Sequence, residues 1–388
     1  MALELRAIHI AGYRSLRSIR FPVGRLSVFV GANGVGKTNL YRALELLQAA
    51  AHGTLARALA EEGGIESALW AGERRKHEPT RIMLEAGFAA GTESDHYAYE
   101  ASAGVHSYAA EIGVRIPTAA AFPMEPQIKE ETLTHHHRGR ARKILERRGP
   151  TLFLRDIDGE RAAASIELLA SETALAAIED VARYPDIYAI RQTMRDWRFY
   201  HEMRTDRDAA LRQPCLAIAT PTLASDGANL AAVFATLTYI REDRTDLDHA
   251  IADAFPGAEL IVPEPERTAR FGMIFPEHPK RVFEAAELSD GTLRYLGLAG
   301  ALLAYRLPAF VALNEPEASL HPDLLEPLAR LIVRAAKRTQ IWLVTHSERL
   351  AAALATEGNL RPFTVIKRNG GTWIEGLSAV GQFADDEE

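Results

Sequence analysis

The sequence predicts an α/β fold, and three buried strands with helices between them carry this prediction. Residues 26–30, 309–313 and 340–344 are short, mostly apolar runs, as expected of strands covered on both faces. Helical spacing of apolar residues follows the first run over residues 38–50. An amphipathic helix that ends near Arg338 separates the other two runs. This alternation of strand and helix is typical of α/β proteins.

The other elements are predicted from local pattern. In the first half we expect, in chain order, a strand at 3–10, a turn at 12–16, irregular helices at 52–78, an antiparallel meander at 80–118, and a charged, mostly helical stretch at 129–215. In the second half we expect a helix at 229–240, a helix that ends at 256–257, short strands near Leu260, Phe271 and Val282, and a helix at 288–303.

A phosphate-binding loop is the most specific motif of the chain. Residues 31–38 read Gly-Ala-Asn-Gly-Val-Gly-Lys-Thr and match G-x-x-x-x-G-K-[ST] at every fixed position. Glycines let consecutive backbone N–H groups curve around a phosphate without Cβ clashes. Lys37 supplies a positive charge to the β- and γ-phosphates, and the Thr38 hydroxyl ligates Mg²⁺. The loop leads into a helix N-terminus, which favours anions. The sequence therefore predicts binding of a nucleoside triphosphate.

Three polar segments in the second half suit the same chemistry. Glu315 follows the strand 309–313, where a carboxylate can reach a γ-phosphate and polarise water. His346 follows the strand 340–344. Leu-Ser-Asp-Gly-Thr at 288–292 opens a helix whose N-terminus suits an anion. Each pattern is common by itself, because an isolated Ser-Asp-Gly is an ordinary helix cap and a histidine after a strand is usually structural.

The charge balance argues against a dedicated nucleic-acid-binding protein, because the chain carries a net charge of −7. Two segments are still compatible with a local basic face: the stretch 135–148 and the arginines between 191 and 212. A solvated helix face is the ordinary interpretation of both, and contact with a phosphate backbone is the alternative. The three adjacent histidines at 135–137 do not share a helix face, which argues against a metal site.

The sequence also predicts a cytoplasmic protein without membrane contact. The longest apolar run, 296–305, stops at Arg306 and is too short to cross a bilayer. The first residues carry charges where a signal peptide would be apolar. The single cysteine, Cys215, excludes an internal disulfide and fits a reducing compartment.

The order of these motifs resembles the ABC-type ATPase heads. It runs from the phosphate loop through Leu-Ser-x-Gly, an apolar strand with Asn-Glu-Pro, and Ser-Leu-His-Pro to a strand with Thr-His-Ser. Gly-Tyr-Arg-Ser-Leu at 12–16 and Glu-Pro-Glu-Ala-Ser-Leu-His-Pro at 315–322 are similar to the RecF/SMC/OLD-like branch and its short "AAA family" ATPases. The segments 197–200 and 225–230 look like the helical lobe of that branch. The resemblance covers nearly the whole chain.

This resemblance implies a P-loop NTPase fold of the ABC-type head, with a mixed central sheet, an antiparallel β subdomain and a helical lobe. Residues 1–388 would form a single head. One lobe would comprise roughly 1–128 plus 300–384, the signature-bearing helical lobe roughly 129–299, and the acidic tail 385–388.

The resemblance also implies roles for individual residues. A homodimer would enclose ATP and Mg²⁺, and ATP hydrolysis would be coupled to its closure. Glu315 would be the general base, and His346 would sense the γ-phosphate. Ser289 and Gly291 would close over the ATP of the opposite subunit. The residues that would hold ATP within one subunit are Arg14, Gly31, Asn33, Gly34, Gly36, Lys37 and Thr38.

The sequence departs from the family pattern at two points. Asn314 stands where an aspartate usually helps to hold Mg²⁺, so its neutral amide oxygen would hold the metal less tightly and hydrolysis could be slow. The glutamine-loop residue is not obvious. Gln127 lies at a plausible distance along the chain, and an ordinary loop glutamine is the alternative.

On family likeness alone, we expect ATP hydrolysis to drive a process in DNA maintenance or phage defence, with DNA or an effector protein as partner. An OLD-type nuclease would need an acidic metal-binding domain after the head, and the segment after His346 is too short for one. A transporter ATPase would carry Leu-Ser-Gly-Gly-Gln, which 288–292 lacks. A regulatory module that binds ATP only to dimerise stays open because of Asn314.

Overall fold

The computed structural model describes residues 3–74, 78–90, 105–115, 122, 124–201 and 203–383. The chain forms two compact units. The first contains Met1–Gly24, Gly31–Trp197 and Phe363–Glu388, and the second contains Arg25–Val30 and Arg198–Pro362. These boundaries differ from those of the two lobes expected from the sequence, and the lobe assignment stays a prediction. The expected acidic tail lies outside the described residues.

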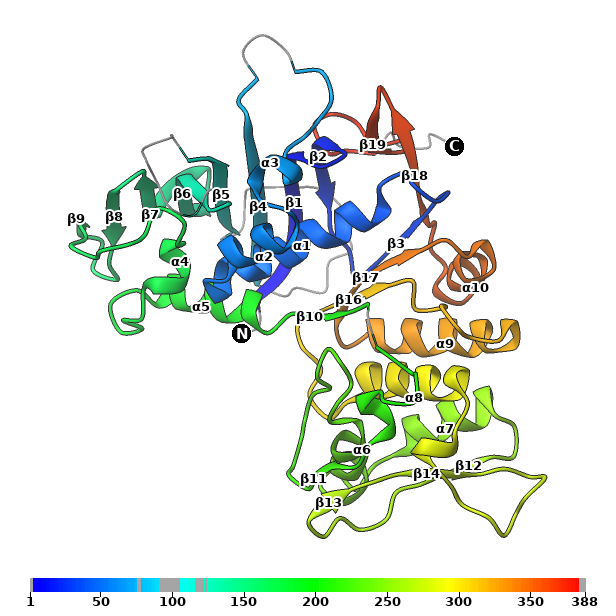
Figure 1. Cartoon of the computed structure of the whole chain (residues 1–388). Coiled ribbons are helices and arrows are strands. Elements are labelled where there is room, and N and C mark those ends of the chain that lie inside the picture. The colour runs from blue at the N-terminus through cyan, green and yellow to red at the C-terminus, as the bar shows by residue number, and fades with distance from the viewer. Residues whose placement is uncertain are drawn as a thin grey trace. The chain divides into compact units, whose positions relative to one another are not determined.

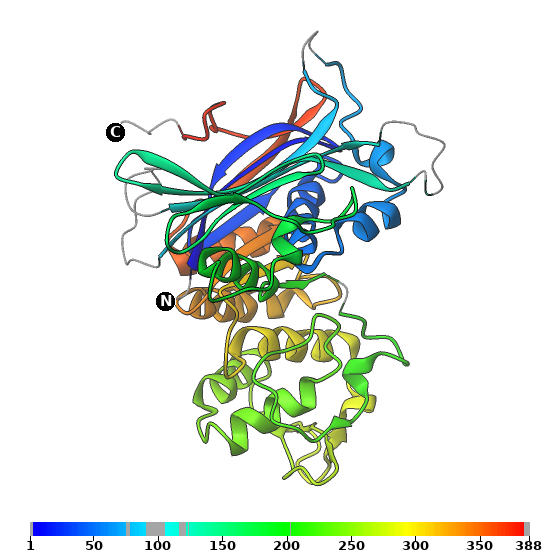
Figure 2. The ribbon, with the colours of Figure 1, turned by 90° about the vertical axis from the view of Figure 1, so that its left-hand side faces the viewer.

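The first unit is built on an eight-stranded antiparallel sheet in the order β2-β1-β4-β5-β6-β7-β8-β9. Figure 2 shows the long blue, cyan and green strands of this sheet. Its strands are β1 Leu3–Tyr13, β2 Leu16–Pro22, β4 Arg81–Ala90, β5 Val105–Val114, β6 Pro126–His137, β7 Arg140–Arg148, β8 Thr151–Arg155 and β9 Arg161–Ala163. Apolar side chains such as Ile10 and Leu84 are fully buried, and α1 packs against β1 and β4. The sheet and this helix therefore share the core of the unit.

Helices and a β-hairpin make up the rest of the first unit among the described residues. The helices are α1 Lys37–His52, α2 Leu55–Glu61, α3 Ile65–Ala68, α4 Ala174–Ala177 and α5 Pro185–Arg195, and the hairpin strands are β18 Phe363–Arg368 and β19 Gly371–Ile374. The apolar spacing that predicted α1 is confirmed, because Leu40, Ala43, Leu44 and Leu47 are all fully buried. The predicted meander is confirmed where it is described, by the antiparallel pairing of β4 with β5.

The prediction that residues 129–215 are mostly helical is wrong for its first part, which forms β6 to β9. Ile128 and Leu133 of β6 are buried, and Lys129 and Glu130 are both only partly buried, so the alternation shifts by one position within the strand. Glu131 is buried as well, and it accepts hydrogen bonds from the Tyr108 hydroxyl and from two backbone N–H groups. The many charged residues of this segment therefore led to a helix prediction, although the segment forms strands. Gln127, the candidate glutamine-loop residue, also lies on β6.

The second unit contains a parallel sheet. Its strands, in order of adjacency, are β10 Arg198–Tyr200, β16 Phe310–Asn314, β17 Gln340–Thr345 and β3 Leu26–Val30. The three buried strands predicted from the sequence are confirmed as β3, β16 and β17, and the α/β fold class is confirmed with them. Nearly every residue of β16 and β17 is buried, because helices α9 and α10 pack against the sheet.

Helices and short strands form the rest of the second unit (Figure 1). The helices are α6 Leu230–Tyr239, α7 Thr245–Ala254, α8 Asp290–Leu303, α9 Leu325–Ala336 and α10 Glu348–Gly358, with 3₁₀ turns at Ala210–Arg212, Ala285–Glu287 and Pro322–Leu324. The short strands are β11 Cys215–Leu216, β12 Glu259–Ile261, β13 Thr268–Ala269, β14 Gly272–Ile274 and β15 Phe283–Glu284. No helix among the described residues is long and apolar enough to cross a membrane.

Candidate functional site

The phosphate loop has the backbone geometry that its glycines predict. The loop, residues 31–36, ends where α1 begins at Lys37. Gly34 and Gly36 have φ angles of +77° and +97°, in the left-handed region that favours glycine. Gly36 is the N-cap of α1, so the N–H groups of the first helical turn follow it directly. A loop of this shape that ends at a helix N-terminus is suited to a phosphate.

Lys37 is held against the loop. Its side chain is buried, and Nζ donates hydrogen bonds to the carbonyl oxygens of Gly31, at 2.6 Å, and Ala32, at 2.9 Å. Thr38 and Asn33 are exposed within the same unit. The ammonium group can exchange its carbonyl partners for phosphate oxygens, which form stronger, charge-assisted hydrogen bonds.

Arg14, a predicted nucleotide contact, is engaged by a carboxylate of its own unit. Its Nη2 and Nε lie 2.7 and 2.8 Å from Oε2 of Glu62. The Tyr13 hydroxyl donates to Oε1 of Glu62 at 2.8 Å. Burial, with Glu62 beside it, raises the pKa of Tyr13 well above its usual range, so the phenol stays protonated and remains a donor. The contact of Arg14 with nucleotide stays a prediction.

Two residues outside the predicted set, Ser15 and Thr372, contact the phosphate loop or its helix. The Thr372 hydroxyl, on β19, donates to the carbonyl oxygen of Val35 at 2.7 Å. Ser15 Oγ lies 2.6 Å from Thr372 Oγ1 and accepts a 2.6 Å hydrogen bond from Asn39 Nδ2. Ser15 belongs to the Gly-Tyr-Arg-Ser-Leu segment noticed in the sequence, but Thr372 belongs to no motif, so the sequence carried no signal for this contact.

The second unit brings Glu315 and His346 together. The parallel register pairs Asn314 with Val344, so the carboxyl ends of β16 and β17 lie side by side. His346 Nδ1 lies 3.6 Å from Oε1 of Glu315. The two side chains are 45% and 38% exposed, so both can reach a ligand and water. Glu315 has a φ of +48°, a left-handed backbone conformation that is costly for a residue other than glycine. Such conformations are common at functional sites.

Glu317 differs from Glu315 in its surroundings. It is 8% exposed, and its Oε1 accepts hydrogen bonds from the Thr345 hydroxyl at 2.5 Å and from the backbone N–H groups of His346 and Ser347. His346 Nδ1 also lies 3.4 Å from this oxygen. Glu317 therefore supports the loop that carries His346, whereas Glu315 is the carboxylate accessible to water.

Mg²⁺ fits the oxygen donors that this chain offers. Asn314 Oδ1 is buried and accepts no hydrogen bond from the described residues, so it can accept one from a metal-bound water. No group of three or more His, Cys, Asp or Glu side chains in the described parts of the chain is arranged to hold a metal ion. In nucleotide-dependent enzymes Mg²⁺ is usually held by one or two protein groups together with the substrate phosphates.

The predicted signature segment begins α8. Ser289 is the N-cap, and its Oγ accepts a hydrogen bond from the N–H of Thr292. A groove of about 660 Å³ lies beside it, lined by Ser289, Gly291, Thr292, Ser319 and His321 among others. Arg212 donates to the carbonyl oxygen of Leu288 and pairs with Asp290, both at 2.7 Å, and so fixes the residues on either side of Ser289.

Several arginines of the two predicted basic stretches point into the protein. Arg147 and Arg191 are buried and donate to backbone carbonyl oxygens, as Arg212 does. Of the adjacent histidines, which lie on strand β6 and not on a helix, His135 stacks on His106 at 4.6 Å. Burial and this neighbour lower the pKa of His135. At these positions the side chains contact other parts of the protein and do not form the basic face that was one alternative from the sequence.

The phosphate loop before α1, together with polar residues at the ends of buried parallel strands, defines an ATPase head of the P-loop class. The family model described as AAA domain, putative AbiEii toxin, Type IV TA system matches residues 26–352. The chain belongs to this family. No curated protein matches the chain.

Solved structures show the same fold. An SMC head bound to the C-winged helix domain of ScpA is 16% identical with a TM-score of 0.53, and the match covers 97% of this chain and 98% of that one. A Pyrococcus furiosus Smc head with an extended coiled coil, bound to the C-terminal domain of ScpA, is 15% identical with a TM-score of 0.51, covering 97% and 96%. The chain therefore has the ABC-type ATPase head fold of the SMC/RecF branch, as its motifs predicted.

Proposed function

We propose that the protein binds and hydrolyses ATP with Mg²⁺, and that two copies close around the nucleotide. The observation that carries the proposal is the placement of Glu315 and His346 at the ends of adjacent parallel strands, 3.6 Å apart and open to water. The phosphate loop, with the buried Lys37 at the start of α1, supplies the groups that phosphates require.

The residues divide the chemistry between them. Lys37 and the N–H groups at the start of α1 stabilise negative charge on the phosphates. Glu315 orients a water molecule toward the γ-phosphorus and accepts its proton, and His346 contacts the γ-phosphate. Thr38 would hold Mg²⁺ through its hydroxyl and Asn314 would hold it through a bound water, and the ion would supply positive charge to the phosphates.

Homodimerisation is the second part of the proposal. The N-terminus of α8 offers N–H groups and a partial positive charge to an anion, and Ser289 and Gly291 line an open groove there. The γ-phosphate of ATP bound to a second copy of the chain is the anion that we assign to this groove. ATP then joins the two subunits, and hydrolysis releases them.

The biological setting is proposed from the family. Its description names a putative toxin of a type IV toxin–antitoxin system, which favours phage defence over DNA maintenance. We propose that the protein acts in the cytoplasm on DNA or on an effector protein. The two solved heads are each bound to a domain of ScpA, so a protein partner has a precedent in this fold.

A regulatory module that binds ATP without hydrolysing it is the second candidate. Asn314 favours it, because a neutral amide holds Mg²⁺ less tightly than an aspartate would. The two candidates differ in a single observable, the release of phosphate.

Phosphate release over several hours tests the proposal, measured with Mg²⁺ in the presence and absence of duplex DNA. We expect slow release that Lys37→Ala abolishes. Tight ATP binding with no release above that of Lys37→Ala would establish the regulatory module instead.

A further inference from the structure

We propose that Thr372 and Ser15 are positioning residues that hold the phosphate loop in its ATP-binding shape. Thr372 lies on β19, and Ser15 lies in the turn between β1 and β2. Neither belongs to the phosphate-loop motif, and 357 residues separate them along the chain. The inference rests on the proposed binding of ATP and names residues that control it.

The glycines at the two ends of the loop are packed against the β18–β19 hairpin. A Cβ atom on Gly36 would lie 1.9 Å from Thr372 Oγ1 and 2.4 Å from Ser15 Oγ. A Cβ atom on Gly31 would lie 2.4 Å from the carbonyl oxygen of Val365, on β18. A Cβ atom on Gly34, in contrast, would meet no atom of the described residues within 4 Å. The hairpin therefore covers one side of the loop, and the side at Gly34 stays open.

A directed chain of hydrogen bonds runs through the two hydroxyls. Thr372 donates to the carbonyl oxygen of Val35, and this uses its only proton. Thr372 must therefore accept from Ser15, at 2.6 Å, and Ser15 in turn accepts from Asn39 Nδ2. This series of hydrogen bonds thus connects the residue before Gly36 to the first turn of α1. The backbone adds a further bond, from the Thr372 N–H to the Ser15 carbonyl oxygen at 2.8 Å.

The Val35 carbonyl determines where the next N–H points. Val35 C=O and Gly36 N–H belong to one planar trans peptide, so they point in opposite directions. When Thr372 holds the carbonyl oxygen toward the hairpin, the Gly36 N–H points away from the hairpin. Consecutive N–H groups oriented in this way form the concave anion site of a phosphate loop. Loss of the Thr372 hydroxyl frees this peptide to rotate.

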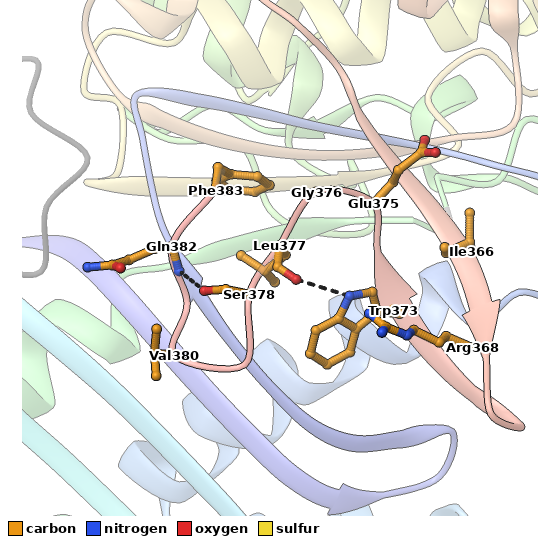
Figure 3. Close-up of a pocket in the computed structure, with 10 residues that line it drawn as sticks. All are labelled: Ile366, Arg368, Trp373, Glu375, Gly376, Leu377, Ser378, Val380, Gln382 and Phe383. Carbon is orange, nitrogen blue, oxygen red and sulfur yellow. Dashed lines mark hydrogen bonds between the residues drawn. The ribbon is translucent and has the colours of Figure 1, made fainter. Parts of the chain in front are cut away.

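The hairpin that carries Thr372 is itself anchored. Successive residues of a strand point to opposite faces, and Trp373 accordingly lines a pocket of about 600 Å³ on the other face (Figure 3). Its Nε1 donates to the Leu377 carbonyl oxygen at 3.1 Å. Phe363 of β18 packs edge-on against Phe21 of β2 at 4.9 Å. The Thr372 hydroxyl is therefore presented from a fixed strand.

Matched variants test the proposal through ATP affinity measured by calorimetry. Thr372→Val keeps the shape of the side chain and removes the hydroxyl, and we expect ATP binding to weaken by about three- to tenfold. Thr372→Ser restores the hydroxyl and should restore the affinity. Thr364→Val is the control, because Thr364 lies on β18 at a position that shares the outer face with Ile366. It should leave ATP affinity unchanged.

Ser15→Ala provides an independent test of the same chain. It should also weaken ATP binding by about three- to tenfold, and combining it with Thr372→Val should add little, because both changes break one set of coupled hydrogen bonds. Turnover at saturating ATP should stay near the parental value, so the effect appears in KM and not in kcat. A role confined to stability would lower the thermal midpoint of unfolding without this loss of affinity.

Each remaining result contradicts a specific claim. Parental ATP affinity in both Thr372→Val and Ser15→Ala would overturn the positioning role while leaving the proposed function intact. A parental protein that does not bind ATP would overturn both. If Thr372→Val does not fold, Ser15→Ala alone decides between these outcomes.

Discussion

The Thr345 hydroxyl donates a 2.5 Å hydrogen bond to Oε1 of Glu317, which joins the end of β17 to the segment that follows the adjacent strand β16. The same oxygen accepts from the backbone N–H groups of His346 and Ser347. A single buried carboxylate oxygen therefore holds the backbone that presents His346. Glu315 and Glu317 lie two residues apart, yet the first is accessible to water and the second is a structural acceptor.

Glu317→Ala should destabilise the protein. The change leaves a hydroxyl and two N–H groups without their buried acceptor, and we expect the free energy of unfolding to fall by about 2 kcal/mol or more. Denaturant unfolding of the variant and its parent measures this difference. A variant as stable as the parent would show that water replaces the carboxylate at no cost.

Glu315→Gln should remove hydrolysis and keep ATP binding. The amide has the shape of the carboxylate but cannot accept a proton from water, so we expect turnover to fall by roughly 10²-fold or more. ATP affinity, measured by calorimetry, should stay near the parental value or rise, because one negative charge beside the phosphates is lost. Parental turnover in this variant would place the general base at another residue.

Lys37→Ala should weaken ATP binding by more than about tenfold, because the phosphate loop loses its positive charge. The side chain bonds carbonyl oxygens of its own loop, so its removal also loosens residues 31 and 32. Calorimetry with ATP and with ADP measures the effect. Unchanged affinity for both nucleotides would contradict the phosphate-loop assignment.

Asn314→Asp should tighten Mg²⁺ binding. The change replaces a neutral oxygen with a charged one at the end of β16, which is the ligand type that Mg²⁺ prefers. The concentration of Mg²⁺ that gives half-maximal phosphate release should fall in the variant. A parental Mg²⁺ dependence would show that the side chain at position 314 does not help to hold the metal.

The sequence predicts those parts of the site whose signals are local. Residues 31–38 carry a complete motif, and mostly apolar runs identified β3, β16 and β17 with nearly correct ends. Glu315 and His346 were predicted separately, each at the end of a buried strand, and it is the direct pairing of β16 with β17 that brings them to 3.6 Å. Helix α8 was found because its cap, Ser289, precedes a long apolar stretch.

Contacts between distant hydroxyls cannot be predicted in this way. The Ser15–Thr372 contact joins two small polar side chains that are common in any sequence, and nothing in their neighbourhoods links them.

The strands β6 and β7 were missed for a different reason. In Arg140–Arg148, three charged residues are exposed at the start of the strand and three more follow Leu145, a composition that also suits the surface of a helix. Only the pairing with neighbouring strands distinguishes the two.

Dimerisation around ATP is the central claim of this account, and Ser289 is the residue through which it is tested. Ser289→Arg places a long side chain at the N-terminus of α8, in the groove assigned to the phosphate of a second copy. The phosphate loop of the same subunit keeps all its own groups. The variant should therefore bind ATP nearly as well as its parent and fail to join two subunits.

Sedimentation of Glu315→Gln with and without Mg-ATP is the most direct measurement, because this variant should bind the nucleotide without consuming it. We expect a monomer without ATP and a dimer with it. Adding Ser289→Arg to the same protein should return it to a monomer in Mg-ATP. An oligomer that forms without ATP and persists in the double variant would contradict the claim.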